Sequence, residues 1–212
     1  MAFPDAWEEV VLVDIALFDA SSPVNKEFAA ITETIDIGEP DYPGESIPNL
    51  AGGRIWKQSP QEDGEVTLEI YPISLDQATA NQGLFQWFNG GTIDASQPLA
   101  TDIAWAAGVS RTRERFRITL LWTDDVAVSS AVAATSTTGS VALRFSAMGC
   151  RITSHKSAYT DGILKTTPVF KFPAMNKAGD VKMYRWDSTS AGGSGETPLV
   201  ALTAYDDEDS WT

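Results

Sequence analysis

The sequence predicts a mainly β fold: a β-sandwich or partly closed barrel with one flanking α-helix and long loops. Several short segments alternate apolar and polar residues with the period of a half-buried strand. Clusters of Gly, Pro, Asp and Ser separate these segments, and only one segment has a helical pattern. A length of 212 residues suits a single domain, 1–212, and 43% hydrophobic residues, with seven Trp and nine Phe, supply its core.

The strand pattern is clearest in 113–122, where Phe116 and Ile118 alternate with Arg and Thr. A turn at 160–162, with the sequence Thr-Asp-Gly, predicts a hairpin between the strands that flank it. Pro168 indicates an edge or a bulge in the second of these strands, because proline cannot donate to a sheet. The expected strands are 10–18, 31–37, 66–73, 113–122, 141–152, 163–172, 181–186 and 199–205.

The remaining segments are expected to be a helix, two loops and a tail. Residues 75–89 are the predicted helix, with Asp76 able to cap its first turn. Segment 38–54 is rich in Gly and Pro, so we expect a long exposed loop. Segment 127–139 is small, rich in Ser and Thr and nearly uncharged, which indicates a flexible loop. Residues 206–212 form an acidic C-terminal tail.

The charge balance argues against nucleic-acid binding. Fifteen Lys and Arg residues face 29 Asp and Glu residues, a formal net charge of −14. Binding to phosphates requires cationic side chains, whereas a surface past which DNA slides requires few of them. Residues 1–30, expected to be an N-terminal arm or strand, carry no early positive charge and do not resemble a secretory signal. No apolar run approaches the roughly 20 residues of a membrane span, so no membrane anchoring is expected.

The motifs of catalysis and metal binding do not occur in the sequence. Cys150 and His155 are the only residues of their kinds, and their odd spacing on a strand places them on opposite faces. Carboxylate pairs such as Asp124 with Asp125 are usually solvated in an acidic protein. The glycine-rich segments lack the Lys-Ser or Lys-Thr of a phosphate-binding loop. We therefore expect no enzyme activity, no catalytic residue, no metal site and no cofactor.

Two rows of charged residues are candidates for surfaces between subunits. The first is a row of arginines at every second position, which is interpreted either as a charged, solvated edge strand or as an interface that meets carboxylates of another copy. The second is a row of carboxylates, which either face solvent or line a channel and keep DNA from adhering. The arginine row is Arg111, Arg113, Arg115 and Arg117, and the acidic row is Glu33, Asp36, Glu65 and Glu69.

Two stretches resemble the tail tube (major tail) proteins of long-tailed, siphovirus-like phages. In 31–73, a strand, a Gly/Pro loop, Gly-Gly-Arg, a Pro-Gln-Glu-Asp turn and a strand ending in Tyr-Pro follow one another. In 161–186, Asp-Gly leads into a strand ending Phe-Lys-Phe-Pro-Ala, followed by a Tyr-Arg-Trp strand. The two stretches cover about a third of the chain.

The resemblance implies a structural virion protein. Its copies would form hexameric rings stacked into a tail tube, with the tape-measure and tail-terminator proteins as partners. DNA would pass through the tube to the host without specific binding during ejection. The protein would reside in the virion tail, after assembly in the host cytoplasm. The resemblance also makes 38–54 an assembly loop, with the candidate contact residues Asp41, Tyr42, Glu45 and Arg54.

Two alternatives remain open at this point. A tube protein of a contractile secretion or injection system follows the same fold logic. A capsid decoration or carbohydrate-binding module would instead present tryptophans such as Trp56, Trp105 and Trp186 as exposed platforms.

Overall fold

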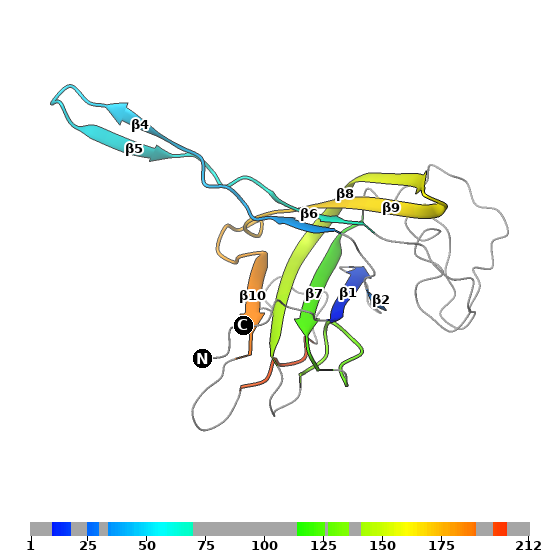
Figure 1. Cartoon of the computed structure of the whole chain (residues 1–212). Coiled ribbons are helices and arrows are strands. Elements are labelled where there is room, and N and C mark those ends of the chain that lie inside the picture. Colours follow the sequence, from blue (N-terminus) through cyan, green and yellow to red (C-terminus); the bar gives the residue numbers. More distant parts are fainter. Residues whose placement is uncertain are drawn as a thin grey trace, which may run out of the picture.

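The computed structural model describes residues 10–17, 25–29, 34–69, 114–125, 127–135, 141–189 and 197–202. These residues form strands and connecting segments, and no helix occurs among them (Figure 1). The strands are β1 (Val10–Leu17), β2 (Asn25–Ala29), β3 (Ile35–Gly38), β4 (Gly44–Pro48), β5 (Arg54–Gln58), β6 (Gly64–Leu68), β7 (Phe116–Thr123), β8 (Ala142–Thr160), β9 (Ile163–Phe172) and β10 (Tyr184–Ser188).

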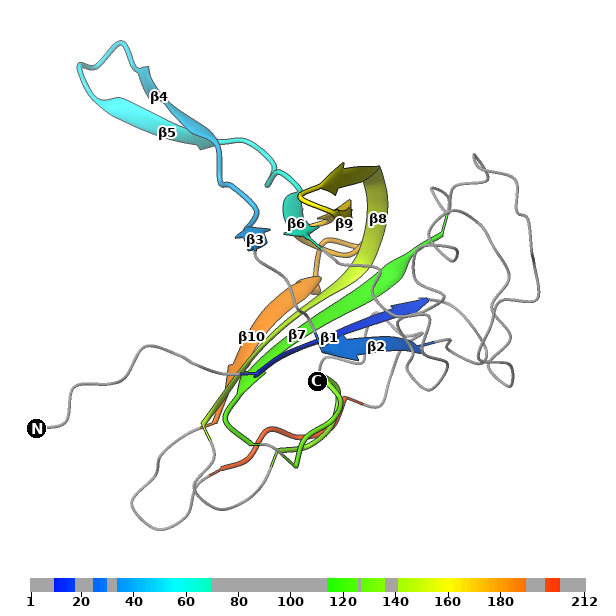
Figure 2. The same cartoon turned by 45° about the vertical axis from the view of Figure 1, so that its right-hand side comes forward.

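Eight strands form one antiparallel sheet in the order β2-β1-β7-β8-β9-β6-β3, with β10 also paired to β8. The long strand β8 joins its two halves. The first part of β8 pairs with β7 and β10, and the part from Arg151 onward pairs with β9. At Gly149, within β8, the backbone takes a φ of 67°, a left-handed conformation that favours glycine. Strand β8 is strongly bent along its length (Figure 2). The sheet therefore curls into a half-barrel (Figure 2).

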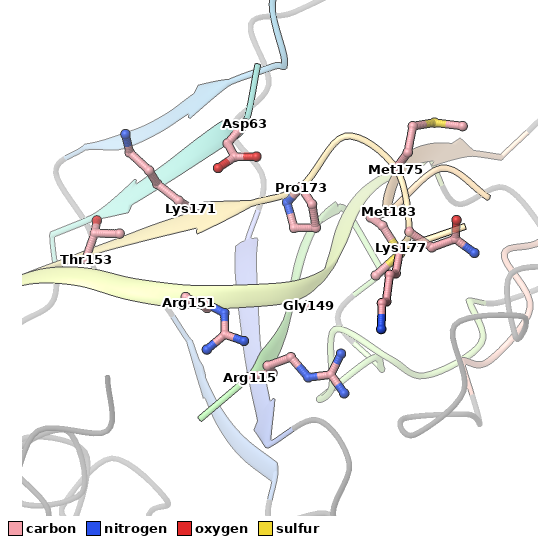
Figure 3. Close-up of a pocket in the computed structure, with 11 residues that line it drawn as sticks. Asp63, Arg115, Gly149, Arg151, Thr153, Lys171, Pro173, Met175, Lys177 and Met183 are labelled. Carbon is pink, nitrogen blue, oxygen red and sulfur yellow. The ribbon is translucent and has the colours of Figure 1, made fainter. Parts of the chain in front are cut away.

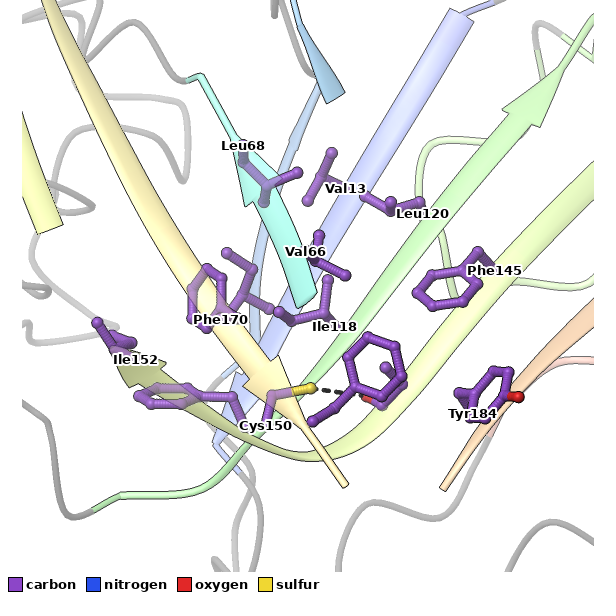
Figure 4. Close-up of a cluster of buried hydrophobic side chains, with 14 residues drawn as sticks. Val13, Val66, Leu68, Ile118, Leu120, Phe145, Cys150, Ile152, Phe170 and Tyr184 are labelled. Atoms are coloured by element: carbon purple, nitrogen blue, oxygen red, sulfur yellow. Dashed lines mark hydrogen bonds between the residues drawn. The ribbon is translucent and has the colours of Figure 1, made fainter. Parts of the chain in front are cut away.

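The main hydrophobic core lies between the two halves of the curled sheet (Figure 4). Phe116 on β7 packs edge-on against Phe170 on β9, with ring centroids 5.8 Å apart. Phe145 on β8 and Phe172 on β9 lie 5.9 Å apart. The alternating apolar residues of β6 and β7 point into this core, as the sequence predicts. Of the two expected forms, the curled half-barrel is nearer to the partly closed barrel than to the sandwich, because one continuous sheet supplies both walls (Figure 2).

The hairpin predicted around 160–162 is confirmed. Asp161 and Gly162 have φ values of 54° and 81°, the positive pair that a two-residue type I′ turn requires. Strand β8 continues eight residues beyond the predicted end at 152 and reaches Thr160. Pro168 pairs with His155 on β8, one residue beyond the last pair between β6 and β9, Thr67 with Val169. It therefore sits where a missing amide donor disturbs only one neighbour.

The outer face of β7 and β8 is covered by two segments that sequence patterns misjudge. Residues 127–135, expected to be flexible, bury Ala131 and Thr135 against this face. Thr135 exchanges hydrogen bonds with Leu199, which lies in a segment predicted to be a strand. Residues 199–202 form no strand. The Leu199 amide donates to the Thr135 hydroxyl and the Leu202 amide donates to the Val132 carbonyl, so these amides are satisfied without a neighbouring strand.

Strand 10–18 is confirmed as β1, which lies between β2 and β7 and so is an integral part of the sheet. The predicted helix 75–89 falls outside the described residues. Among the described residues, no helix is long and apolar enough to cross a membrane.

Candidate assembly surfaces

The β4–β5 hairpin projects well away from the curled sheet (Figures 1 and 2). It occupies the segment expected to be a long loop, and extends it to Gln58. Its two strands pair only with each other among the described residues, and nearly all their side chains are exposed. A period-2 pattern is absent from this sequence because neither face of the hairpin is covered in the single chain.

One face of the hairpin is apolar. Ile47 and Ile55 lie directly opposite each other in the register, with exposed fractions of 40% and 58%. Leu50, in the turn, is fully exposed. On the same face, Glu45 lies opposite Lys57. The hairpin thus presents an aliphatic pair flanked by two opposite charges.

The other face of the hairpin is held together internally. Trp56 lies across Gly44, where a Cβ would come within 2.5 Å of the indole ring. Arg54 donates from Nε to the Ser46 hydroxyl at 2.7 Å and from its terminal nitrogen to the Ser46 carbonyl at 3.2 Å. These contacts fix Arg54 and Trp56 on this face, but the Trp56 ring is still 65% exposed. Both faces of the hairpin therefore present apolar surface to a partner.

The tip and the base of the hairpin are both fixed. At the tip, the Asn49 side chain accepts hydrogen bonds from the amides of Ala51 and Gly53, at 3.1 and 2.8 Å. At the base, the Trp186 indole donates to Glu39 Oε1 at 2.8 Å, and this ring stacks on Trp122 with centroids 6.0 Å apart. The hairpin is therefore a preorganised arm and not a loose loop.

A tyrosine contact strengthens this base. Burial raises the pKa of Tyr184 to about 12, with a further contribution from a hydrogen bond with Tyr42. Tyr184 belongs to β10 and contacts the main core, whereas Tyr42 leads into β4. The contact links the arm to the rigid body of the domain.

The four contact residues predicted in 38–54 all lie on the arm or its base. Asp41, Tyr42, Glu45 and Arg54 are exposed in the single chain. Arg54 is engaged with Ser46 of the same hairpin. Their role between subunits stays a prediction.

The arginine row is divided between the interior and the surface. Arg117 is buried and pairs with the buried carboxylate of Asp14 on β1, with the two atoms 3.3 Å apart. Arg115 is half-buried, and Arg111 and Arg113 lie outside the described residues. The interpretation of this strand as a solvated edge is wrong, because β7 lies between β1 and β8.

The described residues of the acidic row, Asp36, Glu65 and Glu69, lie on one outer face of the sheet, and cations accompany two of them. Glu69 pairs with Lys165 at 2.7 Å, and Glu65 approaches Lys171 at 3.9 Å. Asp36 lies across from Thr67 on the same face and is exposed. Glu33 lies outside the described residues. The face therefore carries mixed charge and not a purely acidic strip.

The single cysteine and histidine form no catalytic pair. Cys150 is buried in the core, where burial raises the pKa of its thiol and the S–H group donates to the Ala147 carbonyl. His155 is half-buried, and desolvation lowers its pKa. In the described part of the chain, no three His, Cys, Asp or Glu residues are grouped so that they could hold a metal ion.

A cavity of about 410 Å³ lies at the bend of β8 (Figure 3). Sequence reasoning missed it, because its lining residues come from five separate stretches of the chain. Apolar lining comes from Gly149, Pro173, Met175 and Met183. Among the residues that the structure describes, the cations Arg115, Arg151, Lys171 and Lys177 and the carboxylate of Asp63 also line it.

No protein-family model matches the chain, and no curated protein matches it. Several solved structures are similar to it at about a tenth sequence identity. A sheath/tube terminator of the extracellular contractile injection system PVC is 10% identical, covering 88% of this chain and 99% of that one, with a TM-score of 0.48. The tube-terminating cap of the anti-feeding prophage is 10% identical, covering 90% and 94%, with a TM-score of 0.46.

An Hcp protein is 8% identical, covering 83% of this chain and 98% of that one, with a TM-score of 0.30. With TM-scores of this size, the assignment of a function rests on the surfaces of the chain itself.

Proposed function

We propose that the chain is a structural, non-enzymatic subunit that assembles with copies of itself into a tube of a phage-like tail or injection device. The observation that carries the proposal is the rigid β4–β5 arm, which presents Ile47 and Ile55 to solvent. The resemblance of 31–73 and 161–186 to tail tube proteins supports the same conclusion.

An arm of this kind is costly for a protein that acts alone. A two-stranded hairpin is marginally stable in water, and exposed apolar side chains lose the free energy that burial would give. Covering the exposed parts of Ile47 and Ile55 would contribute about 2 kcal/mol per arm. In a ring each copy both gives and receives an arm, so this contribution repeats with every subunit.

The ends of the sheet offer a second means of association. In the described residues β3 pairs only with β6, and β2 pairs only with β1. An unpaired strand edge is a template for pairing with another chain. We propose that edge pairing between copies continues the curled sheet around a central bore.

The finer features remain part of the proposal. They comprise a hexameric ring, stacking of rings, contact with tape-measure and terminator proteins, and passage of DNA. The net charge of −14 suits DNA passage because it repels phosphate. If Glu65 and Glu69 line the bore, Lys165 and Lys171 reduce their repulsion of phosphate, so the remaining acidic residues would supply most of it.

Two settings fit these surfaces: the tail of a long-tailed phage and a contractile injection system. The contractile setting has the further support that the similar solved structures include the sheath/tube terminator and the sheath-tube complex of an extracellular contractile injection system. In either setting the protein would belong to the assembled particle.

The arm is tested by the double variant Ile47→Ser with Ile55→Ser. Sedimentation velocity at high protein concentration should show large assemblies for the natural chain and mainly monomers for the variant. Tyr159→Ser also replaces an exposed apolar side chain but lies on β8, away from the arm, so it is the matched control and should assemble normally. Assembly of the double variant to the same extent as the control would refute the role of the arm.

The decoration or carbohydrate-binding alternative has one observation in its favour. Trp56 is 65% exposed, as a binding platform would require. Trp186 fits this role less well, because it stacks on Trp122 and donates to Glu39, and Trp105 lies outside the described residues. Quenching of tryptophan fluorescence by an oligosaccharide, lost in Trp56→Ala, would support this alternative.

A further inference from the structure

The two segments that cover the outer face of β7 and β8, residues 127–135 and 199–202, are bound to each other. They lie side by side at the lower end of the sheet, in green and red (Figures 1 and 2). Three hydrogen bonds join them: the amides of Thr135, Leu199 and Leu202 donate to the Leu199 carbonyl at 3.1 Å, the Thr135 hydroxyl at 2.8 Å and the Val132 carbonyl at 2.9 Å, respectively. The two segments thus form one structural unit, which we call the strap.

An arginine of the sheet holds both segments of the strap. Arg144 on β8 donates to the Ala133 carbonyl at 3.4 Å and to the Val200 carbonyl at 2.8 Å. Its side chain is only 2% exposed, and its guanidinium also approaches the Asp187 carboxylate at 3.5 Å. Since Ala133 and Val200 belong to different segments, movement of either segment alone would break a bond to a buried charge. The two segments should therefore open and close together.

The apolar contact under the strap is small. The buried members of this cluster are Leu12, Leu121 and Ala142 of the sheet and Ala131 and Leu199 of the strap. The main core, in contrast, includes four phenylalanines on facing strands. Hydrophobic stabilisation grows with the apolar area removed from water, so the strap is held less strongly than the two halves of the sheet hold each other.

The charge under the strap further lowers the cost of opening. A buried guanidinium loses its hydration, and burial lowers the pKa of Arg144 for this reason. When the strap opens, water solvates the guanidinium and replaces its bonds to the two carbonyls. An apolar side chain in the place of Arg144 would regain no such hydration.

We propose that the strap is a conformational device that opens as one unit, with loss of the Arg144 contacts, while the curled sheet stays folded. Segments held by few apolar contacts open locally at a lower free-energy cost than the rest of a protein. The opening takes place in the single chain, whether or not copies assemble, and lets solvent reach the outer face of β7 and β8. The strap is in this respect the opposite of the β4–β5 arm, which is fixed at its tip and its base.

Hydrogen exchange of single amides, measured by NMR at a concentration that keeps the chain monomeric, tests the strap. After correction for intrinsic rates, the amides of Thr135, Leu199 and Leu202 should exchange at rates that agree within about threefold. These rates should be at least about a hundredfold faster than that of Leu120, which β7 holds between β1 and β8. Low urea concentrations should change the strap rates little, because local opening exposes little surface.

Two variants of the strap contacts test whether it opens as a unit. Arg144→Ala removes the bonds to both segments and should raise all three strap rates by about tenfold or more. Leu199→Ala, which shortens the largest buried side chain of the strap, should do the same and serves if Arg144→Ala does not fold. The matched control is Val200→Ala, whose side chain is 75% exposed on the same segment, and it should change the rates by less than about threefold.

A variant of the main core separates opening of the strap from unfolding of the whole protein. Ile118→Val weakens the core on the face of β7 opposite the strap, so it should speed exchange at Leu120 by about threefold or more and leave the strap rates within about twofold. An equal rise at Leu120 and in the strap would overturn the inference, because the strap would then open only with the core. Unequal changes of the three strap amides in Arg144→Ala would also overturn it, because the segments would then open separately.

Discussion

Gly64 on β6 is, among the described glycines, the one where an added Cβ would make the closest contact. Its partner in the β6–β9 register is Phe172, and a Cβ built on Gly64 would overlap the Phe172 ring. That ring cannot easily move, because Phe145 and Tyr184 pack against it with centroids 5.9 and 5.5 Å away. Gly64→Ala therefore forces either the ring or the strand to shift.

The size of the effect follows from two opposing terms. Overfilling a packed core costs about 1–3 kcal/mol. Replacing glycine with alanine returns about 0.4–1 kcal/mol by restricting the unfolded chain. The net loss should be about 1–2 kcal/mol, which lowers the urea midpoint by about 0.5–1 M at an m-value of about 2 kcal/mol/M.

Urea unfolding followed by tryptophan fluorescence, at a concentration low enough to keep the chain monomeric, measures this loss. Gly38→Ala is the matched control on the neighbouring strand β3, since its nearest contact would be the Glu65 carbonyl at an ordinary 3.8 Å. Phe172→Leu should cost less in the Gly64→Ala background than in the natural chain, because it frees space for the methyl group. Equal midpoints for Gly64→Ala and Gly38→Ala would refute the steric argument.

Three further predictions concern buried polar groups. Asp14→Asn should lower the free energy of unfolding, measured in urea, by about 3 kcal/mol, because it removes the carboxylate that pairs with the buried Arg117. The control Asp36→Asn, at an exposed position, should change the free energy of unfolding by less than about 0.5 kcal/mol. A similar loss in both variants would contradict the prediction. Cys150 should resist thiol reagents in the native protein and react rapidly in concentrated urea, since burial raises the pKa of its thiol; fast native labelling would show that the core is open. The raised pKa of Tyr184 should stabilise the folded protein fully below pH 10, and this stabilisation should be lost as the pH rises through about 12, because the folded state favours the neutral phenol. The urea midpoint should therefore fall less steeply with pH over this range in Tyr184→Phe than in the natural chain. An equal fall in both proteins would count against the assignment.

The strands that face the core could be predicted from the sequence. Phe116, Ile118 and Leu120 alternate with polar residues because only one face of β7 contacts the main core. The turn at Asp161 and Gly162 was equally readable, since local backbone chemistry determines it. Local patterns succeed where a residue's own neighbours determine its structure.

The assembly surfaces were only partly predictable. The arm was expected as a loop, since Ile47 and Ile55 have no alternating pattern on a hairpin exposed on both faces. Arg117 was expected at the surface, but its partner Asp14 lies 103 residues away in the sequence. The cavity could not be predicted at all, because Arg115, Arg151 and the other lining residues converge only through the bend of β8. Long-range pairing of this kind has no local signal.

Electron microscopy of the purified natural chain in negative stain, across a series of rising concentrations, tests self-assembly most directly. The account predicts rings or tubes with an open centre, together with their loss in the Ile47→Ser and Ile55→Ser double variant. A chain that remains monomeric at the highest concentration, with a folded arm and a normal urea midpoint, would contradict it.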